Sequence, residues 1–185
     1  MVQFKTFASG TEVNGQTVLS CVAAMGAFKN TALHILAEHG IPNPKSGEWY
    51  SQQLWLNALK TIAGSIGENT LLQIGKRTLK NADWPPGTDS IEKALASIDA
   101  VYHMNHRNGE PGHYHFEKTR DGAGKMTCSN PYPCSFDTGV LEAVAERFGS
   151  RDLLVIVRHD DSQPCRKEGA DSCTYLVSWR EFWAI

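Results

Sequence analysis

The sequence has no excess of charge of either sign and no long apolar run. Its 185 residues include 18 basic and 20 acidic side chains, which gives a net charge of −2 with neutral histidines. Binding to nucleic acid or to an anionic membrane depends on clustered Lys and Arg. No apolar run approaches the ~20 residues that span a bilayer, and the N-terminus lacks the basic-then-apolar layout of a signal peptide. We therefore expect a cytoplasmic protein with no nucleic-acid or membrane partner.

The common short motifs of catalysis are also missing. There is no Gly-x-Ser-x-Gly nucleophile elbow and no His-Glu-x-x-His metal motif. The glycines of 121–124 are followed by strand-like residues, so they indicate a hairpin turn and not a nucleotide-binding loop. The sequence assigns no catalytic residue and favours a role other than an enzyme.

What the sequence does contain is enough apolar residues for a core. Hydrophobic residues make up 41% of the chain and charged residues 21%, which is typical of a folded domain. The length fits a single domain over 1–185. The apolar spacing changes from about 3.6 to 2 residues near Gly112, which divides this domain into a helical half, about 1–106, and a sheet-containing half, about 112–185.

The helical half has four segments with helical spacing. We predict a long first helix over 16–39, a second over 54–66, a third over 71–79, and a fourth that Asp89 or Ser90 caps and that runs to Tyr102. The residues before Asn14-Gly15 are short enough for an edge strand or an arm. The long apolar stripe of the first helix makes it a candidate homodimer interface.

The second half has the alternation of an antiparallel sheet. We predict a hairpin from 113–117 and 125–128, a helix that Ser135 or Asp137 caps and Gly149 ends, and strands at 153–157 and 174–179. The predicted fold class is α+β, with N-terminal helices packed on a C-terminal antiparallel sheet that one helix crosses.

Five cysteines in a chain without export signals do not indicate a disulfide framework. Cys21 lies in an apolar segment and is expected in the core. Cys165 and Cys173 flank a loop that Gly169 allows to turn, so that two thiolates could face each other as zinc ligands. Cys134 is a candidate third ligand, because a helix N-terminus favours an anionic thiolate.

These cysteines carry a family resemblance. Cys134 at a helix start, a buried strand, and a Cys-x7-Cys loop leading into another strand resemble the 4-vinyl reductase domain, found in the sensory region of XylR-type activators. That domain is similar in fold to TRAPP subunits and related to haem-based nitric-oxide sensors. The resemblance covers about 112–179 and extends weakly through the helical half.

The resemblance implies a zinc ion held by three cysteines and one acidic residue. The cysteines correspond to Cys134, Cys165 and Cys173, but Ser162 stands where the acid is expected. The fourth ligand is left open among water and the side chains Asp161, which we take as the first choice, Asp160, His159 and Cys128. Four protein ligands would make the site structural, whereas a water ligand is typical of a catalytic or sensing metal.

Four histidines form a second candidate metal or haem site. His103 and His106 are neighbours on one helix face, and His113 and His115 point the same way from a strand. The alternative is that the strand histidines face solvent while Tyr114 faces the core. The Tyr-x-Ser-x-Arg motif of haem nitric-oxide sensors is absent.

Four aromatic residues are candidates to line a pocket for a small hydrophobic or aromatic ligand: Trp49, Tyr50, Trp55 and Trp84. Ordinary core packing is the alternative. The sequence thus predicts a small-molecule-binding sensory domain with a zinc site. The alternatives are a haem-binding gas sensor, a metalloenzyme or tetrapyrrole-modifying enzyme using the histidines, and an adaptor. Any effector would be a separate protein.

Overall fold

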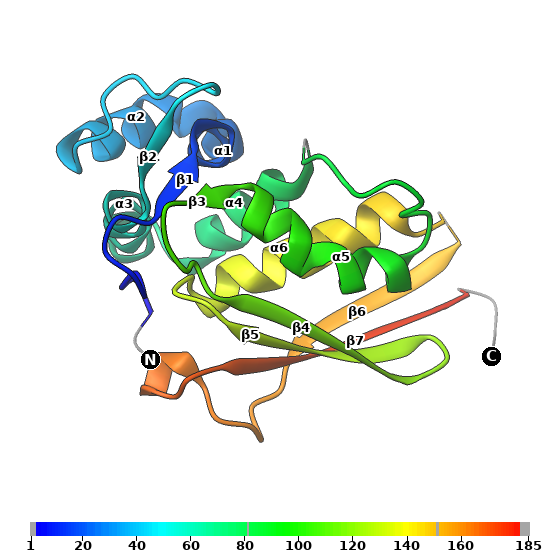
Figure 1. The fold of residues 1–185 in the computed structure, drawn as a ribbon. Helices are drawn as coiled ribbons and strands as arrows, with labels where there is room; N and C mark the ends of the chain where they lie inside the picture. The colour runs from blue at the N-terminus through cyan, green and yellow to red at the C-terminus, as the bar shows by residue number, and fades with distance from the viewer. Residues whose placement is uncertain (1–2, 81, 151, 182–185) are drawn as a thin grey trace.

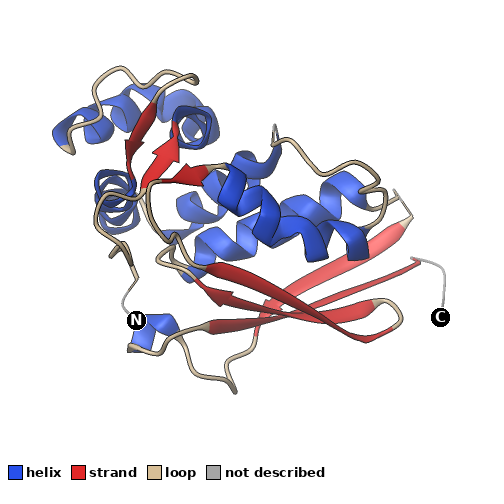
Figure 2. Ribbon diagram, in the orientation of Figure 1, coloured by secondary structure: helices blue, strands red, loops and turns tan. Residues whose placement is uncertain are grey.

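The computed structural model describes residues 3–80, 82–150 and 152–181. The two halves are a helical one and a sheet-containing one, as predicted, so the α+β class is confirmed (Figures 1 and 2). The elements in chain order are β1 (Glu12–Asn14), α1 (Gly15–Met25), a 3₁₀ turn (Gly26–Phe28), α2 (Lys29–Glu38), β2 (Trp49–Ser51), α3 (Gln52–Ser65), α4 (Glu68–Lys80), α5 (Ile91–Met104), β3 (His106–Arg107), β4 (His113–Arg120), β5 (Ala123–Ser129), α6 (Cys134–Phe148), β6 (Leu153–His159), a second 3₁₀ turn (Arg166–Glu168) and β7 (Cys173–Glu181).

The main sheet is antiparallel with the strand order β4-β5-β7-β6. Helices α5 and α6 cover one face of this sheet, and α4 packs on α6 (Figure 1). The predicted hairpin is β4-β5. Cys128 at the end of β5 pairs with Cys173 at the start of β7, which brings the C-terminal strand to the centre of the sheet.

A second, small sheet was not predicted beyond its first strand. It has the order β2-β1-β3 and joins the N-terminal helices to the connection that follows α5. Its strands are two or three residues long. Alternation over so few residues cannot be distinguished from chance.

The predicted first helix is two helices. Gly26, with φ +49°, and the 3₁₀ turn separate α1 from α2. The span Gly15–Glu38 is long and apolar enough, by length and composition only, to cross a membrane. A single such span is weak evidence for a membrane crossing, because a buried core helix has the same length and composition. In the fold α1 buries Val18 and Cys21 and packs against α4. Cys21 is therefore a core residue, as predicted.

The helix that crosses the sheet begins before both predicted caps, one residue before Ser135 and three before Asp137. Cys134 is the first residue of α6 and Pro133 precedes it, while Asp137 is fully buried. Cys134 is therefore at the N-terminus of α6. The start of α6 lies at the same end of the main sheet as the start of β7 (Figure 1).

Candidate metal centre

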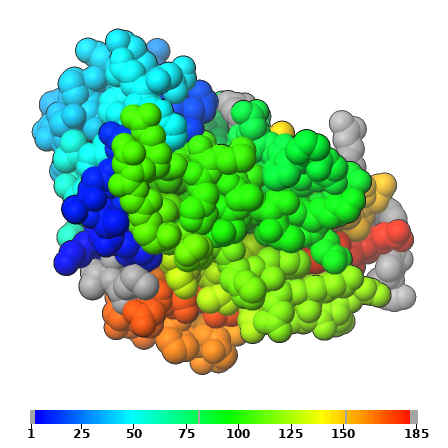
Figure 3. All heavy atoms as spheres, viewed as in Figure 1, coloured from blue at the N-terminus to red at the C-terminus, as the bar shows by residue number. Residues whose placement is uncertain are grey.

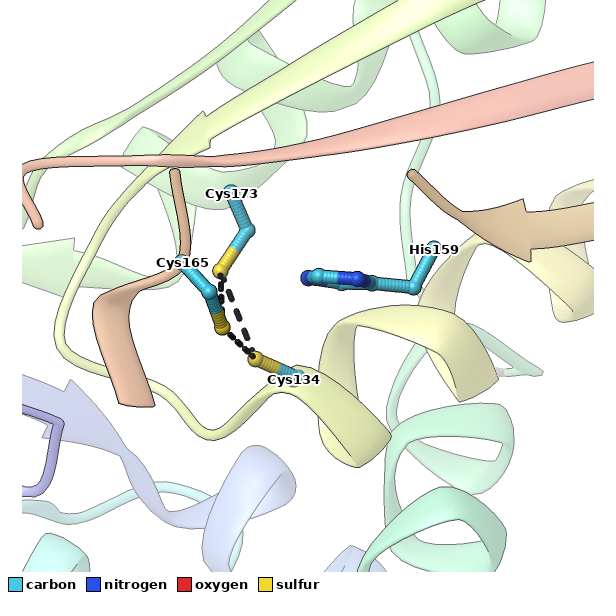
Figure 4. Close-up of side chains that lie close together, drawn as sticks. All are labelled: Cys134, His159, Cys165 and Cys173. Carbon is cyan, nitrogen blue, oxygen red and sulfur yellow. Dashed lines mark hydrogen bonds between the residues drawn. The ribbon is translucent and has the colours of Figure 1, made fainter. Parts of the chain in front are cut away.

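Four side chains from four segments converge beside the start of α6 (Figure 4). Cys134 begins α6, His159 ends β6, Cys165 precedes the second 3₁₀ turn, and Cys173 begins β7. One ligand atom from each residue lies within 4.8 Å of the others. The structure therefore brings together the three cysteines that the sequence singled out.

The spacing of the sulfur atoms suits a shared metal ion. Cys134 Sγ lies 3.3 Å from Cys173 Sγ, and Cys165 Sγ lies 3.6 Å from each of the other two. Bonds of about 2.3 Å at tetrahedral angles would hold sulfurs about 3.8 Å apart around zinc. All five cysteines of the chain are free, so no disulfide explains the close approach.

His159 is the fourth residue of the group. The sequence had favoured Asp161 as the fourth ligand, with His159 among the alternatives. The Nδ1 atom of His159 lies 2.7 Å from Asp161 Oδ1, and its Nε2 atom is buried without a hydrogen-bond partner in the described part of the chain. The ring points toward the sulfurs (Figure 4). In a metal-binding histidine, one ring nitrogen usually hydrogen-bonds to a carboxylate, and the other nitrogen binds the metal. Asp161 itself is 94% exposed at its side chain.

Several N–H groups point at the sulfur atoms. Arg166 donates its backbone N–H and its Nε–H to Cys173 Sγ at 3.3 and 3.4 Å, and the Lys167 N–H donates to Cys165 Sγ at 3.4 Å. Gln3 Nε2 donates to Cys134 Sγ at 2.9 Å. Hydrogen bonds from Cys134 and the nearby Arg166 guanidinium lower the pKa of Cys173. The surroundings therefore favour a thiolate at Cys173, the form that binds metals. The hydrogen bond with Cys173, together with burial, raises the pKa of Cys134.

Arg166 also anchors the centre to the core, a role that sequence reasoning missed. Its guanidinium contacts the Asp137 carboxylate and the Asn130 carbonyl, and the side chains of both ionic partners are fully buried. The Tyr114 hydroxyl donates to the same carboxylate at 2.5 Å. Asp137 lies on the same helix face as Leu141 and Val144. An acidic residue within this apolar stripe is the feature of the sequence that could have indicated a buried ion pair.

The other candidate ligands lie elsewhere. Cys128 is fully buried, and burial is the largest cause that raises the pKa of its thiol. Asp160 accepts from the Ser162 side chain instead of facing the sulfurs.

The structure separates the four histidines of the second candidate site. His106 is buried, with Nδ1 2.8 Å from the Tyr102 carbonyl oxygen and Nε2 2.9 Å from the Tyr132 hydroxyl, so both nitrogens are occupied. His103 and His113 lie side by side with Asp99. His115 is exposed and outside this group, while Tyr114 faces the core.

The four aromatic residues do not meet in one pocket. Trp55 is fully buried in the core, and the Arg107 guanidinium lies 4.4 Å from the Trp49 ring. The Tyr50 hydroxyl bonds to the Glu48 carboxylate. Trp84 packs edge-on against Phe148, near the far end of α6.

An apolar pocket lies between α1, α4, α5 and α6. It is lined by Tyr102, Tyr114, Tyr132 and Phe136 among others, and it encloses about 30 Å³. That is room for a single water molecule. Pockets for organic ligands usually hold about 300–1,000 Å³.

The fold and the site define an α+β domain with a candidate thiolate metal centre at one end. No protein-family model and no curated protein sequence matches the chain. Its fold is that of H-NOX domains. An H-NOX protein from S. oneidensis, in the Fe(II)NO ligation state, has a TM-score of 0.68 and 16% identity, over 91% of this chain and 99% of that one.

Two further solved structures agree with this match. A structure concerned with haem redox potential and porphyrin distortion has a TM-score of 0.64 and 12% identity, over 91% of this chain and 95% of that one. An oxygen-binding H-NOX domain related to soluble guanylate cyclases, as an oxygen complex, has a TM-score of 0.63 and 10% identity, over 93% of this chain and 98% of that one.

These matches correct the family resemblance that the sequence suggested. The identification with the 4-vinyl reductase domain is wrong, because the solved structures that share this fold include H-NOX proteins and domains. The alternative of a haem-binding gas sensor fits these neighbours better. The resemblance misled because it rested on the cysteine pattern, and a pattern of metal ligands can recur on related folds.

Proposed function

We propose that this chain is a sensory domain in which one metal ion, zinc by the chemistry of its ligands, is bound by Cys134, His159, Cys165 and Cys173. The observation that carries the proposal is the convergence of these four ligand atoms within 4.8 Å. Three thiolates and an imidazole in a closed group are a common ligand set of zinc.

The unpartnered nitrogen of His159 supports the same conclusion. A buried polar atom without a partner costs about 1–3 kcal/mol, and such atoms are rare in folded proteins. His159 Nε2 is one of these atoms, and it is directed at three sulfurs, of which that of Cys173 has surroundings that favour the thiolate. A metal ion would satisfy both the nitrogen and the negative charge.

The centre is placed to pass a signal into the core. Cys173 accepts hydrogen bonds from Arg166, Arg166 pairs with Asp137, and Asp137 accepts from Tyr114 on β4. A change in the charge of the centre therefore acts on a buried ion pair, where electrostatic effects are strong.

The signal that suits this centre is a small oxidant. Cys134 and Cys165 are only partly buried. One hydrogen peroxide and two protons would oxidise these two thiolates to a disulfide and yield two water molecules, and the loss of two ligands would release the metal.

A haem-binding gas sensor is the second candidate, because the H-NOX structures that share the fold include an NO-ligated iron protein and an oxygen complex. The residues of this chain do not fit a haem. Aromatic side chains fill the apolar pocket to about 30 Å³, and the sequence has Tyr132-Pro133-Cys134-Ser135-Phe136 and no Tyr-x-Ser-x-Arg motif. We therefore expect no Soret band from the purified protein. Stoichiometric haem would replace the metal-thiolate proposal as the main function.

Elemental analysis of protein purified without added metal tests the proposal. We expect about one equivalent of zinc in the unmodified chain and little in the double variant Cys165→Ser, Cys173→Ser. The matched control is Cys21→Ser, which removes a buried thiol outside the group and should keep the zinc. Equal zinc content in the double variant and in Cys21→Ser would contradict the assignment.

A further inference from the structure

A second group of ligand-type side chains lies where α5 ends and β4 begins. His103 is in the last turn of α5, Asp99 lies one turn before it, and His113 is the first residue of β4. One ligand atom from each lies within 4.8 Å of the others. Glu110, in the connection between them, is close to both rings. This connection lies at the molecular surface, where it is coloured green in the space-filling view (Figure 3).

The hydrogen bonds of the two rings determine which nitrogens are free. His103 Nδ1 lies 2.8 Å from the backbone carbonyl oxygen of Asp99, which can only accept, so Nδ1 carries the proton. The lone pair of the neutral His103 ring is therefore on Nε2. His113 Nδ1 lies 3.4 Å from Asp99 Oδ1, which leaves its Nε2 free as well. Asp99 is itself fixed, because its Oδ1 accepts the Tyr114 N–H at 2.8 Å.

Both free nitrogens face the same carboxylate oxygen. Glu110 Oε1 lies 3.7 Å from His103 Nε2 and 3.6 Å from His113 Nε2. The two rings are 5.2 Å apart between centroids and are tilted by 37°, so they stand side by side. Ligand atoms around a tetrahedral ion with bonds of about 2.0–2.1 Å are about 3.3–3.4 Å apart. The two distances from Glu110 Oε1 to the ring nitrogens are within about 0.4 Å of this spacing.

We propose that His103 Nε2, His113 Nε2 and a Glu110 carboxylate oxygen form a second metal site, for a divalent first-row transition ion. Asp99 is a positioning residue. Its carboxylate lies beside Nδ1 of both rings, the nitrogens that do not bind the ion. Carboxylates commonly orient metal-bound histidines in this way. Imidazole with carboxylate suits zinc, nickel and copper. The four side chains are 36–59% exposed, so water completes the coordination and the ion exchanges with solvent.

The site is chemically distinct from the cysteine centre and shares no residue with it. It joins the end of α5 to the start of β4, across a connection that also holds β3. A bound ion would tie that helix to the edge strand of the main sheet.

Calorimetric titration of Ni²⁺ into untagged, zinc-loaded protein tests the site. We expect one saturable equivalent of Ni²⁺ with no loss of zinc. His113→Ala should abolish this binding, and Asp99→Asn should weaken it about 10- to 100-fold. The matched control is His115→Ala, on the same strand and also exposed but outside the group, which should bind as the unmodified chain does.

The variant Cys165→Ser, Cys173→Ser separates the two sites. Ni²⁺ binding that persists in this variant and depends on His113 supports the second site even if the zinc proposal fails. Absence of a saturable equivalent in the unmodified chain, or equal binding by His113→Ala and His115→Ala, would overturn the proposal.

Discussion

Arg166 and Asp137 form an ion pair that no solvent reaches, and the pair lies directly behind the Cys173 sulfur. Burying two charges costs several kcal/mol per ion, which their mutual attraction and added hydrogen bonds must offset. Here Tyr114 and Asn130 supply those added bonds. The pair thus links the candidate metal centre to the core, through the hydrogen bond from Arg166 to Cys173 and the ion pair with Asp137.

Removing the cation of this pair should destabilise the fold strongly. Arg166→Met leaves Asp137 buried without its partner, and such losses cost about 3–5 kcal/mol. Chemical denaturation measures the free energy of unfolding. Lys167→Met is the matched control, because Lys167 pairs with Glu68 at an exposed site and such pairs are worth less than about 1 kcal/mol. Equal losses in the two variants would contradict the role given to Arg166.

His106 should make the fold sensitive to mild acid. Burial lowers its pKa from 6.5 to about 4, so below pH 6.5 the unfolded chain binds a proton that the folded chain does not. The stability that neutral His106 contributes is complete above pH 6.5 and is lost as the pH falls through 4, by about 3 kcal/mol in all. The free energy of unfolding measured from pH 7.5 to 4 should fall less in His106→Gln than in the unmodified chain. Parallel curves would disprove this assignment.

At the scale of elements, α4 and α6 approach each other so closely that each has a glycine where it meets the backbone of the other. A Cβ atom at Gly75 would collide with the Phe136 carbonyl oxygen, and one at Gly139 would collide with the Leu72 carbonyl oxygen. Backbone atoms cannot move aside as a flexible side chain can. The close packing also fixes the start of α6, where Cys134 lies.

Alanine substitutions at helical glycines test this contact. Gly139→Ala should destabilise the protein by more than about 2 kcal/mol, because the helices must move apart. Gly64→Ala in α3 meets no neighbouring atom within 4 Å and is expected to stabilise by up to about 1 kcal/mol, through helix propensity alone. Thermal unfolding of the two variants gives the comparison. A neutral Gly139→Ala would show that the helices do not pack as described.

Sequence periodicity was sufficient for most elements but not for their junctions. Ser90 is one of the two predicted caps of α5, with Asp89 the other, and the Ser90 side chain accepts the Lys93 N–H. The break at Gly26 was missed because the apolar stripe continues on both sides of it. The small sheet was mostly missed because its pairing is long-range.

The same limits apply to the site. The three cysteines were found from their types and spacing, while His159 was one of several alternatives. Which residue in 159–162 faces the sulfurs depends on where β6 ends, and spacing alone cannot fix that end. The buried partners of the centre, Arg166 and Asp137, come from a tertiary contact between a loop and a helix.

At the scale of the whole molecule, one buried core extends from the N-terminal helices to the central strands of the sheet. The candidate metal centre lies at its edge and brings together four segments of the second half. Because a metal binds the folded state and not the unfolded one, its binding free energy adds to stability. The homodimer expected from the first helix stays a prediction. A monomer by light scattering at high micromolar concentration would remove it.

Chelation should therefore lower the unfolding temperature of the whole domain. We expect a decrease on treatment with a strong zinc chelator, and recovery when zinc is restored. The variant Cys165→Ser, Cys173→Ser should begin at the lower temperature and respond to neither treatment. A chelator effect of the same size in this variant would place the stabilising ion elsewhere.

X-ray absorption at the zinc edge tests the central claim most directly, because it reports the atoms bound to the ion. The four residues identified here predict three sulfur neighbours at about 2.3 Å and one nitrogen at about 2.0–2.1 Å. The His159→Ala variant should lose the nitrogen and keep the three sulfurs. A shell of oxygen and nitrogen alone in the unmodified protein, or no bound zinc, would contradict the assignment of the centre to Cys134, His159, Cys165 and Cys173.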